Sequence, residues 1–523
     1  MERKWWTLIA VSVATFMLLL DITVVNTALP SIQEDLNASF TDLQWVVDAY
    51  TLSLAALVLT AGVLADRLGR RRVFAAGLGI FSLASLLAGL ATDPTFLNLA
   101  RALQGVGGAV MFAVSLALIA QEFRAGRERG TAMGVYGATI GIAVAVGPLV
   151  GGLLTEYVGW QSIFFLNVPI GIAAIAITYT KLRETRDPNA SRIDWGGLVT
   201  FSSSLFLLVL GLLRGNDEGW GSTLIVSLLG GATVLMIAFL AIETRVKEPM
   251  LPLHLFKRPA FTGVQLAALA VSASMFALFL YLTLYLQGYL GHDPVEAGLR
   301  YLPVTVVNFV VAGATGALLS RVPARVLISA GLGITGLGLL LMGGVDANSD
   351  WTHLLPGFIL AGAGVGLINP AIADVAVSVV PKDHAGMASG INDTFRQVGI
   401  AIGIAAWGAI FLGRGAAKVS DLAAGTPAAG GARPRELVEA VSSGHIDQAV
   451  AAAPPGARAG IVAAREGFLS GFNEIIMLGG ILAVAGAVLA LWLIREDDIE
   501  RETPIEVEPQ LLPPEAEPQL VAA

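Results

Sequence analysis

Apolar runs of about 20 residues, separated by short polar breaks, repeat along almost the whole chain. A run of that length crosses the hydrocarbon core of a bilayer as a helix, so each run predicts a transmembrane span. The fourteen predicted spans are 6–28, 46–65, 73–91, 96–121, 131–154, 162–181, 195–213, 223–242, 261–288, 298–319, 326–343, 353–376, 386–412 and 468–494. The predicted fold class is an all-α integral membrane protein.

The loop between the second and third spans is short and basic. It reads GVLADRLGRRRV from Gly62 to Val73. Its arginines are Arg67, Arg70, Arg71 and Arg72. Lys and Arg in short loops are retained on the cytoplasmic side. Gly62 and Gly69 permit close helix packing and a sharp turn. Asp66 can pair with an arginine or face the positive N-terminus of another helix.

Basic residues favour alternate loops throughout the chain, whereas the short loops on the other side hold essentially Arg214 alone. One missed or invented helix would invert this bias downstream, so the bias supports an even number of spans. We therefore expect a multi-pass protein of the cytoplasmic (inner) membrane with both termini in the cytoplasm.

Composition narrows the function classes. The chain is 55% hydrophobic and 14% charged. It has no cysteine, which excludes disulfides and thiolate metal sites, and its five histidines form no ligand-spaced cluster. We expect no metal and no cofactor. The net charge of −8 arises from outer loops and the C-terminal tail, and nucleic acid is not an expected partner.

The chain also contains a weak internal duplication. GALLSRVPAR, Gly316 to Arg325, echoes the basic loop, with Ser320 where Asp66 stood. We predict two six-helix bundles, and proteins built from such repeats bind substrate between the halves near the midplane. The predicted bundles are 1–182 and 261–495, joined by a linker with two extra spans at 183–260. The second bundle includes an external loop, 413–467, with a short helix around 434–441, and 496–523 is expected to be a disordered cytoplasmic tail.

Ionisable residues inside predicted spans are functional candidates, because a charge in hydrocarbon costs about 3 kcal/mol or more. Asp21 and Arg101 enter from opposite faces and reach the same depth, so they can meet. Burial favours the protonated form of the Asp21 carboxyl group, whereas the nearby arginine favours the ionised form. A carboxyl group balanced in this way can bind and release a proton. The alternative is a permanent ion pair that fixes packing. Asp393 and Arg396 are spaced to pair on one helix, with a structural role equally open.

Weaker candidates lie near the membrane edges or in the small-residue and aromatic patterns. The edge charges are Asp48, Asp374 and Glu474, for which snorkelling is the alternative. The fifth span carries Gly141, Gly147, Pro148, Gly151 and Gly152. This small-residue face predicts close helix packing and a kink. It could seal the bundle against ion leak and let the helix bend during transport, or it could be ordinary membrane packing. Tyr281 and Tyr285 could line a drug cavity by cation–π contact or belong to an interfacial belt.

These motifs resemble, in order and over nearly the whole chain, the fourteen-span drug:proton antiporter family of the major facilitator superfamily. The matching segments are LDITVVNTALPSI (20–32), the basic loop, LNLARALQGVGGA (97–109), GPLVGG (147–152), WQSIFFLNVPIG (160–171) and GMASGINDTFRQVG (386–399). The resemblance implies proton-driven export in which Arg101 and Asp21 assist proton transfer. It also implies that Asp66 meets the helix beginning near Gly386 and latches the halves together. Gln161 stands where such relatives often have arginine.

Other functions are less well supported. ATP-driven transport needs a phosphate-binding loop ending in Gly-Lys, and this chain has no such pair. No catalytic set or added soluble domain suggests an enzyme. The sequence therefore predicts a monomeric, proton-coupled antiporter that exports amphipathic small molecules. The alternatives are a dedicated exporter of an endogenous lipid, peptide or siderophore, or a proton symporter.

Overall fold

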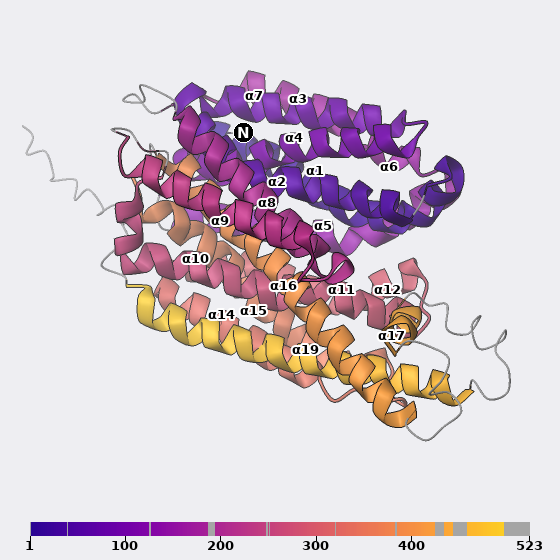
Figure 1. Cartoon of the computed structure of the whole chain (residues 1–523). Helices are drawn as coiled ribbons and strands as arrows, with labels where there is room; N and C mark the ends of the chain where they lie inside the picture. The colour runs from indigo at the N-terminus through magenta and orange to yellow at the C-terminus, as the bar shows by residue number, and fades with distance from the viewer. Residues whose placement is uncertain are drawn as a thin grey trace, which may run out of the picture.

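The computed structural model describes residues 2–38, 40–124, 127–186, 194–246, 249, 251–319, 321–381, 384–423, 434–442 and 458–495. Within these ranges the chain forms helices and no strands, so the all-α fold class is confirmed. The N-terminal helices lie above the C-terminal helices in Figure 1, with α8 and α9 in front of their junction.

The first seven helices are α1 (Arg3–Leu36), α2 (Phe40–Leu68), α3 (Arg70–Gly89), α4 (Pro94–Glu122), α5 (Arg127–Tyr157), α6 (Gln161–Phe165) and α7 (Asn167–Lys181). Two further helices follow, α8 (Trp195–Glu218) and α9 (Thr223–Glu243). The C-terminal part begins with η1 (Leu253–Lys257), α10 (Pro259–Val271), the π-helix η2 (Ser272–Phe276), α11 (Ala277–Thr283) and the π-helix η3 (Leu284–Tyr289). It continues with α12 (Pro294–Arg300), α13 (Leu302–Leu318), α14 (Ala324–Met342), η4 (Trp351–Leu354), α15 (Leu355–Ser378), α16 (Ala385–Ala423), α17 (Pro434–Ser442) and α19 (Arg458–Leu493).

Every predicted span coincides with a helix or a run of successive helices. In the described residues, twelve of these are long and apolar enough to cross a membrane. The other two predicted spans correspond to α5 and to α13, which is a shorter apolar helix of 17 residues. The protein is therefore a multi-span membrane protein, and the total of fourteen spans stays a prediction.

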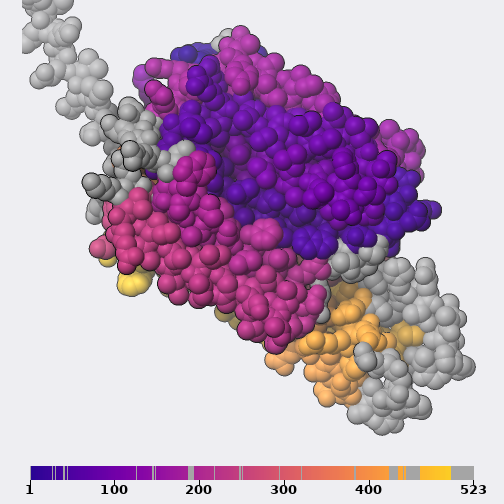
Figure 2. Space-filling model, turned by 45° about the horizontal axis from the view of Figure 1, so that its top comes forward, coloured from indigo at the N-terminus to yellow at the C-terminus, as the bar shows by residue number. Residues whose placement is uncertain are grey.

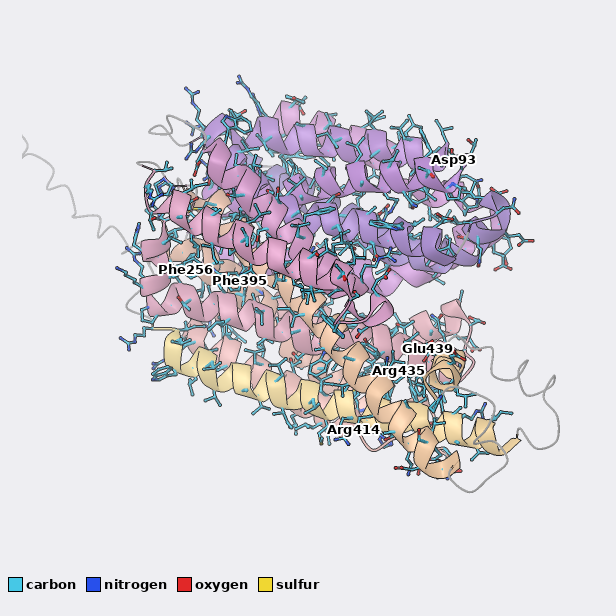
Figure 3. The ribbon with its side chains drawn as sticks, viewed as in Figure 1. Asp93, Phe256, Phe395, Arg414, Arg435 and Glu439 are labelled. Atoms are coloured by element: carbon cyan, nitrogen blue, oxygen red, sulfur yellow. The ribbon has the colours of Figure 1, made fainter. Side chains whose placement is uncertain are left out.

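Polar breaks set where helices begin. Asp93, labelled in Figure 3, caps α4 by accepting a hydrogen bond from the backbone N–H of Phe96 at 2.9 Å. Asp194 caps α8 through the N–H of Gly197 at 2.8 Å. Such caps satisfy backbone donors that the first turn leaves unpaired. The short breaks between apolar runs therefore define the helix ends.

Two apolar cores hold the N-terminal and C-terminal helices. One packs around Phe74, Phe81 and Phe123, and the other around Phe261 and Phe358. Buried aromatic rings of this kind contribute most of the packing area in helical bundles. Both cores also take in residues of the other half, such as Leu59 in one and Val377 in the other, so the division into two bundles stays a prediction.

Helix α8 joins the two halves. Thr60 of α2 and Ser202 of α8 share a hydrogen bond of 2.8 Å. The side-chain amide of Asn216 donates to the carbonyl oxygen of Ala405 on α16 at 3.0 Å. Helix α9 packs mainly on α8 and is largely exposed. The extra helix pair therefore covers the junction from outside.

The segment 413–467 is more helical than predicted. Helix α16 continues to Ala423 and α19 begins at Arg458, so both extend beyond the predicted spans. The orange end of α16 projects at one end of the molecule in Figure 2. Gly415 and Gly467 let the extensions touch. The predicted short helix is confirmed as α17, with Val438 and Val441 buried. Residues 424–433, 443–457 and the tail 496–523 lie outside the described residues.

Candidate functional site

The carboxyl group of Asp21 on α1 is enclosed within the N-terminal helices. Arg101 Nη1 donates to Asp21 Oδ2 at 2.5 Å. The amides of Gln104 and Asn167 donate to Oδ1 at 2.7 and 3.0 Å. Asp21 is only 4% exposed. Three helices, α1, α4 and α7, therefore converge on one carboxylate whose oxygens both have partners.

Arg101 is equally well held. Its Nη1 also donates to Gln104 Oε1 at 2.6 Å, and its Nε donates to the carbonyl oxygen of Val46 at 3.0 Å. The guanidinium lies 4.3 Å from the centre of the Tyr50 ring, an attractive cation–π distance. In this conformation the two charges form a paired, buried unit, hereafter the charge cluster, comprising Asp21, Arg101, Gln104 and Asn167.

The second charged helix site differs from its prediction. Asp393 and Arg396 do not form the local ion pair expected from their spacing. Arg396 Nη1 instead donates to Asn369 Oδ1 on α15 at 3.2 Å, and its guanidinium lies 5.5 Å from the Phe276 ring. Asp393 is 2% exposed, and its Oδ2 has no hydrogen-bond partner among the described atoms. Arg396 therefore contacts α15 and η2, which pack against α16, and not Asp393 on its own helix.

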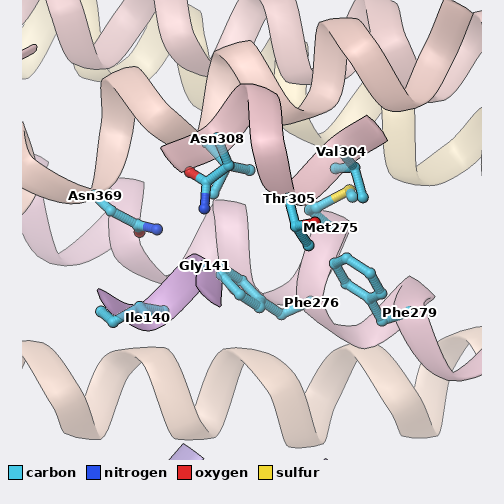
Figure 4. Close-up of a pocket in the computed structure, with 10 residues that line it drawn as sticks. Ile140, Gly141, Met275, Phe276, Phe279, Val304, Thr305, Asn308 and Asn369 are labelled. Atoms are coloured by element: carbon cyan, nitrogen blue, oxygen red, sulfur yellow. The ribbon is translucent and has the colours of Figure 1, made fainter. Parts of the chain in front are cut away.

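A cavity of about 30 Å³ lies where α5 meets the C-terminal helices. It is lined by Ile140, Gly141, Met275, Phe276, Phe279, Val304, Thr305, Asn308, Val365 and Asn369. Figure 4 shows Asn308 and Asn369 directed into the same space. Asn308 Oδ1 and Asn369 Nδ2 are buried and have no hydrogen-bond partner among the described atoms. A space of this size is large enough for a water molecule and too small for a drug.

Tyr281 and Tyr285 do not line this cavity, and a place for them in a drug cavity stays a prediction. The hydroxyl of Tyr281 donates to the carbonyl oxygen of Ile404 at 2.8 Å, and the ring of Tyr285 stacks on Phe472 with centroids 4.9 Å apart. Tyr285 also stacks on Tyr289 with centroids 5.5 Å apart, so the four-residue spacing does place these two rings on one face. The aromatic residues at the cavity are Phe276 and Phe279.

Helix α5 presents glycines to the C-terminal half. A Cβ at Gly130 would collide with the carbonyl oxygen of Gly316 on α13. A Cβ at Gly141 would collide with the side chain of Asn308. The two helices therefore approach as closely as backbone atoms allow, as small residues permit in membranes.

The opposite face of α5 packs on α1. A Cβ at Gly147 would collide with Thr23, and one at Gly151 would lie 3.0 Å from the carbonyl oxygen of Val24. Thr23 and Val24 follow Asp21 on the same helix. Helix α5 thus connects the helix that carries the charge cluster with the wall of the cavity.

The outer part of α5 is continuous. The helix runs unbroken from Arg127 to Tyr157, and the predicted kink stays a prediction. A Cβ at Gly152 would lie 3.1 Å from Val295 of α12. The side chain of Pro148 lies outside the described residues.

The end of the molecule that carries the basic loop, hereafter the basic end, holds the two halves together. Asp66 Oδ1 accepts hydrogen bonds from Arg70 Nε at 2.8 Å and Nη2 at 2.7 Å. The backbone N–H groups of Gly386 and Met387, at the start of α16, donate to Asp66 at 3.1 and 2.8 Å. A carboxylate at a helix N-terminus is favoured by the helix dipole. The contact crosses from α2 to α16.

Glycines permit this crossing, and they do so twice. A Cβ at Gly62 would collide with the carbonyl oxygen of Gly386, just as Gly130 abuts Gly316 on the other pair of helices. The α2–α16 and α5–α13 contacts are therefore alike, which is the structural counterpart of the sequence echo at 316–325. Ser320 within that echo lies outside the described residues.

The rest of the basic loop supports the turn. Gly69 has φ +110°, a conformation that favours glycine, and a Cβ there would lie 2.6 Å from Glu184. Arg71 Nε lies 3.6 Å from Glu184 Oε2. Nη1 of Arg67 is buried and lacks a hydrogen-bond partner among the described atoms. Glu184 thus anchors the loop to the segment after α7.

A second bridge spans the halves near the basic end. Arg129 Nε on α5 donates to Asp374 Oδ1 on α15 at 2.8 Å, and its Nη2 donates to Ser378 at 2.6 Å. Arg129 is 5% exposed. The sequence alone could not show that Arg129 and Asp374 pair, because 245 positions separate them.

The remaining edge charges make weaker contacts. Asp48 lies 3.9 Å from Arg214, whose guanidinium is 4.9 Å from the Trp45 ring. Glu474 pairs with Arg414, labelled in Figure 3, at 3.2 Å, but the arginine side chain is 62% exposed. The exposed Arg414–Glu474 pair therefore contributes little, about 0–1 kcal/mol.

A family model described as Major Facilitator Superfamily matches residues 11–404. The chain belongs to this superfamily. Membership in the Major Facilitator Superfamily makes the chain a membrane transporter and not an enzyme, as predicted. The match covers the charge cluster, the basic end and the cavity.

Relatives within the superfamily are named for drug resistance or export. The chain is 40% identical over 424 residues to the puromycin resistance protein pur8 of Streptomyces alboniger, covering 80% of this chain and 84% of that one. It is 33% identical over 509 residues to the tetracenomycin C resistance and export protein of Streptomyces glaucescens, covering 95% and 93%. It is 36% identical over 404 residues to the multidrug resistance protein Stp of Mycobacterium tuberculosis, covering 77% and 75%.

A solved structure supports the superfamily fold. The human organic anion transporter MFSD10 (TETRAN) superposes with a TM-score of 0.64 over 93% of this chain and 99% of that one. The sequence identity is 12%, so this likeness concerns the fold alone.

Sequence reasoning missed the amide groups of the site. Gln104 lies three residues after Arg101 on one helix, and Asn167 lies in the WQSIFFLNVPIG segment. Asn308 and Asn369 are isolated amides in apolar helices. Polar side chains inside spans are a usable signal, because hydrocarbon disfavours them.

Proposed function

We propose that the protein is a proton-coupled antiporter that exports amphipathic drugs across the cytoplasmic membrane, with the basic end in the cytoplasm. The observation that carries the proposal is the buried charge cluster, in which a carboxylate able to bind a proton lies in a three-helix cage. The names of the relatives, which concern resistance and export, support the direction and the class of substrate.

Proton binding at Asp21 has a defined consequence. Protonation would weaken the charge-assisted bond to Arg101, which is about twice as strong as a neutral hydrogen bond. Helix α1 would then be free to shift against α4. Because α1 packs on α5 through Gly147 and α5 packs on α13 through Gly130, that shift would reach the opposite half.

The basic end and the cavity complete the cycle. With the Asp66 and Arg129 bridges formed, the basic end is held shut. The cavity is then too small for cargo, so the halves must separate at one end for a drug to enter. Asn308 and Asn369 would offer the cargo an acceptor and a donor, while Phe276 and Phe279 would offer apolar surface.

Transport in everted membrane vesicles tests this function. Vesicles energised to acidify their interior should accumulate ethidium or puromycin, and an ionophore that collapses the proton gradient should abolish accumulation. One proton moving through 100 mV contributes about 2.3 kcal/mol, so about 150 mV supports a gradient of a few hundredfold for a neutral substrate. Accumulation that persists with the ionophore would reject proton coupling.

A dedicated exporter of one endogenous compound is the second candidate. The tetracenomycin C relative, named for a single compound, aligns with nearly the whole chain. A resistance screen of an expressing strain across a chemically diverse panel separates the two. Broad, ionophore-sensitive resistance supports the multidrug function, and protection against one compound class supports the dedicated exporter.

The helix contact at Gly147 gives a prediction. Gly147→Ala should lower the initial transport rate about tenfold or more, because the added methyl group meets Thr23 and overpacking costs about 1–3 kcal/mol. Gly79→Ala on α3 is the matched control, since its Cβ would meet nothing within 4 Å. Equal rates in the two variants, at equal membrane abundance, would contradict the role of this contact.

A further inference from the structure

The basic end carries an open hollow of about 440 Å³ that the transport cycle does not use. It lies where three helix ends meet, namely the start of α1 at Arg3, the start of α3 at Arg70 and the end of α7 at Lys181. Arg3, Arg71 and Lys181 line it together with Trp6 and Tyr179. Three cations therefore share one recess with two aromatic rings.

The positive charge of this hollow is only partly compensated. Arg71 is paired with Glu184, at 3.6 Å. Arg3 and Lys181 form no ion pair with any described carboxylate. Lys181 Nζ lies 5.6 Å from the Trp6 ring, and Arg71 lies 6.0 Å from the Tyr179 ring. The rings thus hold cations in place without neutralising them.

Apolar surface continues from the hollow along the same helices. Ile9 on α1 is 37% exposed and Ile172 on α7 is 61% exposed. Tyr179 is itself 54% exposed. In a membrane protein such surface faces lipid chains, and Trp and Tyr mark the headgroup level. A lipid at the hollow would therefore find cations for its headgroup and apolar side chains for its acyl chains.

We propose that this hollow binds the phosphate headgroup of an anionic membrane lipid. Arg3 and Lys181 would bind the phosphate, and the acyl chains would lie along Ile9 and Ile172. A free phosphate ion would satisfy the cations but leave the apolar surface unused. Because the hollow involves the ends of α1 and α7, both of which supply the charge cluster, a bound lipid would brace that part of the N-terminal half.

Native mass spectrometry of the purified full chain, titrated with short-chain phosphatidylglycerol, tests the proposal. The Arg3→Gln, Lys181→Gln double variant should bind this lipid about 30-fold more weakly, because each cation near the membrane surface contributes about fivefold. The control is Arg245→Gln with Lys257→Gln, which removes two exposed positive charges outside the hollow and should bind like the wild type.

Two further arms identify the ligand. Phosphatidylcholine of the same chain length should bind weakly, and inorganic phosphate should not displace phosphatidylglycerol at equal concentration. Equal affinity in the wild type and the double variant would overturn the proposal, as would equal binding of phosphatidylcholine. Displacement by equimolar phosphate would show a simple anion site instead. None of these outcomes depends on transport, so they are independent of the proposed function.

Discussion

Asp21→Asn should abolish substrate accumulation in energised everted vesicles, lowering the gradient from a few hundredfold to about one. The asparagine cannot exchange a proton, so the proton gradient can no longer drive cargo. Arg101, Gln104 and Asn167 all donate hydrogen bonds to the Asp21 carboxylate. The NH2 group of the asparagine is itself a donor, so it would face donors where an acceptor is needed. Accumulation measured with ethidium, with and without ionophore, checks the result.

This substitution also affects folding, and a second variant separates the two effects. Removing one partner of a buried pair costs about 3–5 kcal/mol, because the remaining charge is uncompensated. Asp21→Asn combined with Arg101→Gln removes both charges and should recover most of the thermal stability in detergent. It should not recover accumulation. Glu156→Gln, an exposed acid-to-amide change, should leave both properties unchanged.

Recovery of accumulation by the double variant would contradict the coupling role of Asp21. The pair would then be only a packing device, the alternative that the sequence also allowed. Loss of stability without loss of accumulation in the single variant would lead to the same conclusion.

Asp66→Asn should open the basic end and lower the transport rate by about 10- to 100-fold. Asp66 holds four hydrogen-bond donors, two from Arg70 and two from the start of α16. Hydrogen bonds to charged groups contribute about 1.5–3 kcal/mol each. Weakening them shifts the population toward separated halves, and a shift of 1.4 kcal/mol is tenfold.

Spin labels can measure this opening, because the chain has no cysteine of its own. Labels at Leu68→Cys and His384→Cys flank the α2–α16 contact, and both positions are exposed. The Asp66→Asn background should move the distance distribution toward longer values, whereas Glu156→Gln should not. An unchanged distribution with reduced transport would show that Asp66 acts on something other than the contact between halves.

Much of the fold could be predicted from sequence because hydrocarbon imposes strong rules. Every apolar run became a helix, and the polar residues that interrupt the runs became caps, as Asp93 and Asp194 show. The extensions of α16 and α19 were missed because the sequence there has no continuous apolar run. They are stabilised by packing between Gly415 and Gly467, far apart in sequence.

The sequence could predict only those site residues that stand out one by one, as charges within apolar runs do. Asp21, Arg101 and Asp66 are conspicuous charges in apolar surroundings, and the structure gives each a partner. Arg396 was assigned to its helix neighbour because spacing describes one helix, whereas its partner Asn369 comes from another. The tyrosines of the ninth predicted span do share a face where Tyr285 stacks on Tyr289, but spacing could not show that the described cavity lies elsewhere. Partners across helices are a product of tertiary packing.

Proton release on substrate binding tests the central claim most directly. Purified protein in weakly buffered detergent solution, mixed with puromycin or ethidium, should release on the order of one proton per bound molecule, read with a pH-sensitive dye. The Asp21→Asn, Arg101→Gln double variant should bind the compound and release none. Equal proton release by that variant and the wild type would contradict the claim that Asp21 is the exchanging group.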